Sequence, residues 1–230
     1  MKTPAKKRSR GRPSGVTPEQ LRIAILDIQG KVPTLDDLCD KLAVQKTTLY
    51  KYIRGQEALV QQAADIVMAE SRIPAVTSGM HWAQWARLYA GSQLKGFQRY
   101  PVLLEQLTPH PRQMKHLEEA ILALVECGLD TVTALYTCNA MINIAVGAAS
   151  AYEHGLMPNS QETADKRFHD AVRKTPHDLP LLRSLVAEGY ASSGEPVFED
   201  NVCFILAGIA KRRGESLPAE LDRTSLGMSV

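Results

Sequence analysis

The residues from 46 to 51 concentrate side chains that can bond to nucleic acid. A lysine ammonium group can bind phosphate oxygens or the O6 and N7 acceptors of guanine, and a threonine hydroxyl can serve either partner. Polar groups of this kind are carried by Lys46, Thr47, Thr48, Tyr50 and Lys51. Leu49 and Ile53 have the spacing of an inward helical face. We therefore expect a short helix over about 46–53 with a polar outer face.

The preceding segment predicts the element that would position this helix. Thr34 can cap a helix whose first turn holds Asp36 and Asp37, where the helix dipole favours negative charge. Apolar residues that could pin two crossing helices are Leu38, Leu42, Val44, Leu49 and Ile53. With Ala43 and Val44 as the tight turn, residues 34–53 have the shape of a helix-turn-helix, whose second helix enters the major groove.

The rest of the chain predicts further helices and no strands. Thr17, Pro18 and Gln20 form a capping-box start for a first helix that ends near Gly30. Further helices are expected over about 56–72, 80–98, 101–107, 112–127, 130–154, 163–174, 178–192 and 196–213. No segment has sustained alternation of apolar and polar residues rich in β-branched side chains, so we expect an all-α fold.

Charge and composition suggest four regions. Residues 1–60 contain twelve basic and six acidic residues, whereas residues 61–230 contain fifteen and nineteen. We expect a flexible basic arm over 1–16, a helix-turn-helix domain over 17–60, a helical domain over 61–213 and a polar, frayed tail over 214–230. In the arm, Arg10 and Arg12 flank Gly11 before Pro13, which resembles arms that insert arginine into A·T-rich minor grooves.

Several classes of protein are disfavoured. The chain has no G-x-S-x-G, H-E-x-x-H, GxxxxGK[ST] or GxGxxG motif, so we expect no enzyme. Its four cysteines lie far apart, as is usual for buried thiols in a reducing cytoplasm. The longest apolar run, residues 140–152, is short for a membrane span, and no signal peptide is evident.

The run from Thr34 to Leu59, TLDDLCDKLAVQKTTLYKYIRGQEAL, resembles the DNA-binding segment of TetR-family transcriptional regulators. The likeness extends, less strongly, through residues 129–153 and the blocks LPLLRSLVAEGY and PVFEDNVCFILAGIAKRR, which resemble the tetracycline-repressor subgroup. Trp82 also stands where that subgroup has a tryptophan.

The resemblance implies roles for the N-terminal residues. Thr34 and Tyr50 would bind DNA phosphates. The residues that would contact DNA bases or the adjacent DNA backbone are Lys46, Thr47, Thr48, Lys51 and Tyr52. Three positions depart from the family pattern. Where the family usually has a glycine in the turn, this chain has Ala43, and where it has a lysine that binds a phosphate, this chain has Gln56. A position that is usually basic and contacts a base is Asp36 here, and among base edges its carboxylate suits only a cytosine amino group.

For the C-terminal part, the resemblance implies a homodimer through the helices at 130–154 and 196–213, where residues 145–151 are mostly small. A ligand pocket would lie between the helices that start near 80, 101, 112 and 130. Its expected lining is Trp85, Tyr89, Gln93, Leu104, Leu107, His110, Leu117, Asn139 and Asn143. The metal-ligand positions of tetracycline repressors are occupied by Leu104, Asn143 and Ala151, so we expect no metal and no cofactor.

These features favour a cytoplasmic homodimeric repressor that binds a palindromic double-stranded DNA operator and is released by a small apolar or aromatic effector. Two alternatives remain open. The first is a DNA-binding regulator or architectural protein whose core is filled, which an empty apolar cavity would disfavour. The second is a protein-interaction module, against which the basic arm argues.

Overall fold

The computed structural model describes residues 15–106, 111–153, 161–176, 178–188 and 195–221. Within these ranges the chain is helical, with no strand, so the all-α expectation is confirmed. The elements are α1 (Pro18–Leu26), α2 (Leu35–Leu42), α3 (Lys46–Leu49), α4 (Gln56–Glu70), α5 (Trp82–Arg99), the 3-10 helix η1 (Pro101–Gln106), α6 (Pro111–Glu126), α7 (Thr131–Glu153), α8 (Gln161–Lys174), α9 (Pro180–Ala187) and α10 (Glu195–Arg213).

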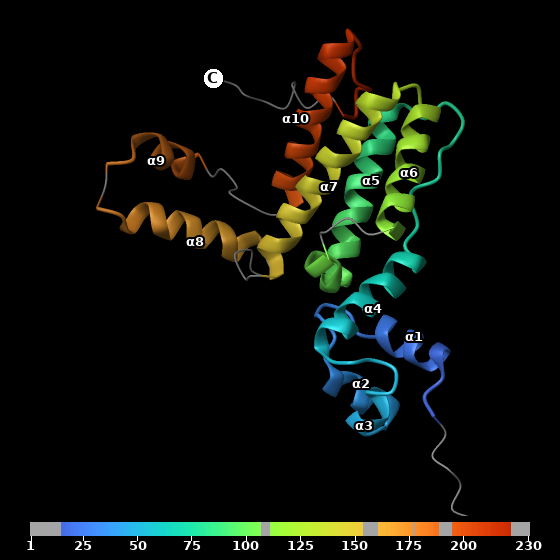
Figure 1. Cartoon of the computed structure of the whole chain (residues 1–230). Helices are drawn as coiled ribbons and strands as arrows, with labels where there is room; N and C mark the ends of the chain where they lie inside the picture. Colours follow the sequence, from blue (N-terminus) through green and yellow to red (C-terminus); the bar gives the residue numbers. More distant parts are fainter. Residues whose placement is uncertain (1–14, 107–110, 154–160, 177, 189–194, 222–230) are drawn as a thin grey trace, which may run out of the picture.

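Helices α1, α2 and α3 form a small cluster at one end of the molecule, and α4 leads from it to the larger bundle (Figure 1). The first two helices begin where their sequences predict. Thr17 and Gln20 form a reciprocal capping box on α1, and Thr34 and Asp37 form one on α2. The cluster is held by fully buried apolar side chains at Ile25, Leu38, Leu49, Ile53 and Leu59.

The larger bundle is built around α5 and α7, which pack along each other, with α6 and α10 packed against α7 (Figure 1). Its core includes Trp85, Tyr89, Leu124, Met141 and Leu206, which are all fully buried. Helices α8 and α9 pack on each other and lie to the side of this bundle in Figure 1.

Helix α7 is long and apolar enough over Thr131–Ala151 to cross a membrane, judged by length and composition alone. This stretch is longer than the apolar run at 140–152 considered from the sequence. One face of α7 supplies core residues of the bundle at Ala134, Cys138, Met141, Ala145 and Ala149. Packing against neighbouring helices accounts for this buried face, whereas Val132 and Tyr136 on the same helix are exposed.

Five expected elements differ from the structure. Helix α1 ends at Leu26 rather than near Gly30, with Asp27 as its C-cap. Helix α3 ends at Leu49 rather than near Ile53, because the Tyr52 amide bonds the Leu49 carbonyl in a tighter turn. Residues 101–106 form a 3-10 helix, and α9 ends at Ala187. The expected frayed tail is wrong for residues 214–221, because Leu221 is buried and Trp82 Nε1 donates to Glu215 at 2.9 Å.

Candidate functional site

Helix α3 presents its polar residues to solvent while Leu49 anchors it. Leu49 is fully buried, whereas Lys46, Thr47 and Lys51 are exposed. Tyr50 and Tyr52 are 49% and 44% exposed, so both aromatic side chains are accessible to a partner. Thr48 is half-buried beside them. The structure therefore gathers these predicted residues on one exposed surface at the end of the molecule.

Asp36 pairs with the first residue of α3. Its Oδ1 lies 2.7 Å from Lys46 Nζ, so the two charges join α2 to α3 across the turn. The hydrogen bond and the charge of Asp36 raise the pKa of Lys46, which keeps the ammonium protonated. In the free protein, Asp36 thus neutralises one lysine of the surface.

Thr34 and Gln56 are both engaged in holding the helices in place. The Thr34 hydroxyl donates to Asp37 Oδ2 at 2.7 Å and accepts from the Asp37 amide at 3.2 Å. Gln56 Nε2 donates to the Pro33 carbonyl at 2.7 Å, so Gln56 ties the start of α4 to the loop before α2. Both contacts hold the start of α2, the first helix of the helix-turn-helix, in place.

The turn between α2 and α3 has a left-handed residue. Ala43 has φ 51° and ψ 45° and follows the last residue of α2. It is the one non-glycine residue with positive φ among the described residues. A left-handed conformation brings Cβ close to the following carbonyl oxygen, which explains why glycine is the usual residue at this turn.

The root of the basic arm lies beside this surface. A Cβ placed on Gly15 would come within 3.0 Å of Tyr52 Oη, so the backbone there runs against the Tyr52 side chain. Val16 next to it is buried. Arg10 and Arg12 lie outside the described residues.

A second candidate site is a cavity of about 700 Å³ bounded by the end of α4 and by α5, α6 and α7. Four of the expected pocket residues line it, namely Tyr89, Gln93, Leu117 and Asn139. Leu104 and Asn143 do not, because Leu104 is half-buried in η1 and Asn143 is exposed on α7. Leu107 and His110 lie outside the described residues.

Trp85 stands behind the cavity wall and does not line it. Its ring stacks on Tyr89 with centroids 5.1 Å apart, and its Nε1 donates to the Pro74 carbonyl at 3.0 Å. Trp85 is therefore a support for the Tyr89 ring, which itself faces the cavity.

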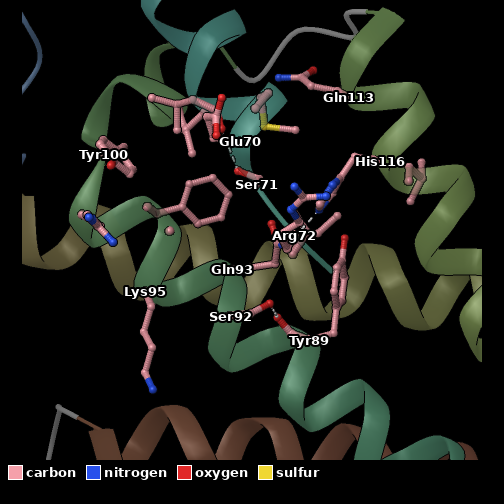
Figure 2. A pocket seen from close by; sticks show the side chains of 18 of the residues that line it. Glu70, Ser71, Arg72, Tyr89, Ser92, Gln93, Lys95, Tyr100, Gln113 and His116 are labelled. Atoms are coloured by element: carbon pink, nitrogen blue, oxygen red, sulfur yellow. Dashed lines mark hydrogen bonds between the residues drawn. The ribbon is translucent and has the colours of Figure 1, made fainter. Parts of the chain in front are cut away.

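Figure 2 shows polar side chains that meet inside the cavity. The Tyr89 hydroxyl is buried and has no hydrogen-bond partner among the described residues, and burial raises the pKa of Tyr89. Burial also lowers the pKa of His116, so its ring is neutral at pH 7, and its Nε2 lies 3.3 Å from Gln93 Nε2. The cavity thus offers an unused phenol donor beside a neutral imidazole and an amide.

Several lining residues are not predicted by the sequence. Ser71 and Arg72 directly follow α4, and His116 lies on α6 opposite Tyr89. Nothing in the local pattern distinguishes Arg72 from any basic residue near a helix end. His116 likewise has no local sequence feature that distinguishes an inward-facing histidine from an exposed one.

The fold and these two sites define a class of protein, in which a small helix-turn-helix cluster is joined by one helix to a helical bundle that contains a cavity. Residues 77–213 match the tetracyclin repressor-like C-terminal domain family, which covers more than half of the chain. The chain therefore belongs to the TetR family of DNA-binding transcriptional regulators.

Solved structures share this fold. ActR of Streptomyces coelicolor, determined in complex with actinorhodin, superposes with a TM-score of 0.66 at 19% identity over 86% of this chain and 97% of its own. TetR of Acinetobacter baumannii AYE gives 0.60 at 18% identity over 87% and 100%. The regulator SCO7222 of S. coelicolor gives 0.62 at 17% identity over 85% and 98%.

No curated protein sequence matches the chain at a significant level. Within the described part of the chain, no group of three or more His, Cys, Asp and Glu side chains is arranged to hold a metal ion.

Proposed function

We propose that this regulator is a ligand-responsive homodimeric repressor, which binds a palindromic operator and leaves it when a small molecule fills the cavity. The observation that carries the proposal is the position of α4. This helix begins at the helix-turn-helix cluster, and its last residues Val67, Met68 and Glu70 line the cavity. A ligand that contacts the end of α4 can favour one position of the cluster, provided that it binds the two states with different affinity.

The exposed surface of α3 supports the DNA-binding half of the proposal. We assign the DNA contacts to Arg10, Arg12, Thr34, Lys46, Thr47, Thr48, Tyr50, Lys51 and Tyr52. Lysines and hydroxyls at the start of a short exposed helix are suited to phosphates and base edges in the major groove. The basic arm would follow the neighbouring minor groove, because its root lies beside Tyr52.

Exposed apolar side chains on α7 and α10 support the homodimer. Val132 and Tyr136 on α7 are 61% and 69% exposed, and Phe204 on α10 is 71% exposed. Large apolar residues on two helices that pack together commonly mark an interface. A symmetric dimer would set two α3 helices about one DNA turn (~34 Å) apart.

The cavity supports a small effector with apolar or aromatic character, because Tyr89, Phe97 and Leu117 contribute to its wall. An architectural protein with a filled core has no need of such a space. We assign residues 1–16 to the arm, 17–60 to the DNA-binding domain and 61–213 to effector binding and dimerisation, although α4 spans the boundary at 60. A cytoplasmic location and the absence of enzymatic activity belong to the same proposal.

Selection of bound sequences from random double-stranded DNA tests this function. We expect the purified protein to enrich a pseudo-palindrome whose half-sites lie about one helical turn apart (~34 Å). Enrichment of a single half-site would overturn the homodimeric reading. No enrichment above the input would overturn sequence-specific binding.

A further inference from the structure

The acidic side chains at the cavity form ion pairs with basic residues that do not line it. Glu70 pairs with Arg22 at 2.7 Å, and Asp27 pairs with Lys41 at 3.6 Å. Neither Arg22 nor Lys41 lines the cavity. The two carboxylates therefore add little negative charge that a ligand would meet.

The basic groups at the cavity are not neutralised. Arg72, Lys95 and Arg99 belong to the lining, and none of the three forms an ion pair with another described residue. Arg99 lies over the Tyr100 ring, with 5.3 Å from its guanidinium carbon to the ring centroid. In Figure 2, Lys95 points away from the cavity, whereas Arg72 extends into the region of Gln93 and His116. Arg72 is thus the cation best placed to meet a ligand.

The groups around Arg72 complete an environment for an aromatic anion. Tyr89 offers a flat face, backed by Trp85, and a buried hydroxyl without a partner. A phenol whose pKa is raised stays protonated and can donate to a ligand oxygen, and the neutral His116 adds no charge, which leaves Arg72 as the cation beside them. Phe97 and Tyr100 contribute further apolar wall.

We propose that the effector of this regulator is an aromatic anion, a planar ring system with a carboxylate or sulfonate that pairs with the Arg72 guanidinium and accepts from the Tyr89 hydroxyl. This inference rests on the proposed function, because it names the ligand class of the same cavity. Arginine suits this role because its planar fork can bond both oxygens of a carboxylate at once.

Two fluorescent probes that differ in one group test the proposal. They are 8-anilinonaphthalene-1-sulfonate, an aromatic anion, and N-phenyl-1-naphthylamine, its neutral counterpart. We expect the wild-type protein to bind the sulfonate at least about tenfold more tightly. Arg72→Gln should weaken sulfonate binding by about tenfold and leave the neutral probe within about twofold, which also shows that the cavity is intact.

Arg173→Gln is the matched control, because it makes the same substitution at an exposed arginine of α8 that does not line the cavity. Equal affinity of the wild type for both probes would overturn the proposal. An equal loss in Arg72→Gln and Arg173→Gln would also overturn it, because the effect would then reflect net charge alone. Ser92→Trp, which fills part of the cavity, should weaken both probes, and unchanged binding would place them elsewhere and count against the proposal.

A DNA shift with the same samples separates this proposal from the proposed function. If the charge preference holds while neither probe changes operator binding, ligand-responsive release fails and the ligand class stands. If the neutral probe binds as tightly as the sulfonate and releases DNA, the regulator stands and the anionic effector fails.

Discussion

Ala43 shows how a single residue can hold a conformation that its side chain disfavours. It sits at φ 51° in the turn between α2 and α3, where a side chain costs about 1 kcal/mol relative to glycine. We predict that Ala43→Gly raises the free energy of unfolding by about 1 kcal/mol in urea denaturation. Ala58→Gly, on the exposed face of α4, is the control and should lower it by about 1 kcal/mol. A loss of stability in Ala43→Gly would contradict the turn geometry.

His116 should make stability depend on pH. Burial lowers its pKa from the ordinary value of 6.5, so the unfolded chain takes up this proton at a higher pH than the folded chain. Its stabilising contribution is therefore complete above pH 6.5 and is lost as pH falls below it. We predict that His116→Gln flattens the pH dependence of urea midpoints measured between about pH 5.5 and 8. Parallel curves for the two proteins would count against a buried neutral His116.

Lys51 should contribute directly to operator binding. It is exposed just beyond α3 and has no ion-pair partner among the described residues, in contrast to Lys46. We predict that Lys51→Ala weakens operator binding by ~1–3 kcal/mol in a titration. Lys174→Ala removes the same charge from α8 and should have no comparable effect. Similar losses for the two variants would remove Lys51 from the DNA contacts.

Individual residues of the cavity were only partly predictable. Tyr89, Gln93, Leu117 and Asn139 lie on helices whose positions follow from the family resemblance. Arg72 could not be found in this way, because its place at the cavity depends on where the chain turns after α4. Trp85 was assigned to the lining because a sequence pattern does not distinguish a wall residue from the layer behind it.

At the scale of elements, α7 and α10 should carry the dimer. We predict that Phe204→Glu on α10 shifts the protein from dimer to monomer in analytical ultracentrifugation, because it places two charges, one from each copy, in an apolar contact. Ile23→Glu on α1 is the control, since Ile23 is also exposed, at 47%, and lies in the helix-turn-helix cluster. A dimer that persists in Phe204→Glu would move the interface to another face.

The helix starts were more predictable than the helix ends. Thr17 and Thr34 mark their helices by local capping chemistry, which the sequence contains in full. The end of α3 and the path of residues 214–221 depend on distant partners. Glu215 bonds Trp82 and Leu221 is buried against the bundle, and neither contact leaves a local signal.

At the scale of the whole molecule, the two parts differ in charge and in the kind of site they carry. The first 60 positions contain twelve basic and six acidic residues, whereas acidic residues outnumber basic ones beyond them, and the cavity lies between α4 and the bundle. Helix α4 belongs to both parts, and we therefore propose it as the element through which a bound ligand alters DNA binding. The overall charge of +2 conceals this asymmetry.

Binding to DNA from upstream of the protein's own gene tests the central claim most directly. We would measure an electrophoretic shift with excess competitor DNA at about 50 and 200 mM salt, since charge-driven binding weakens steeply over this range. The account predicts a shift that survives competitor and weakens with salt. A shift that appears equally on any DNA and only at low salt, or no shift at either salt, would contradict it.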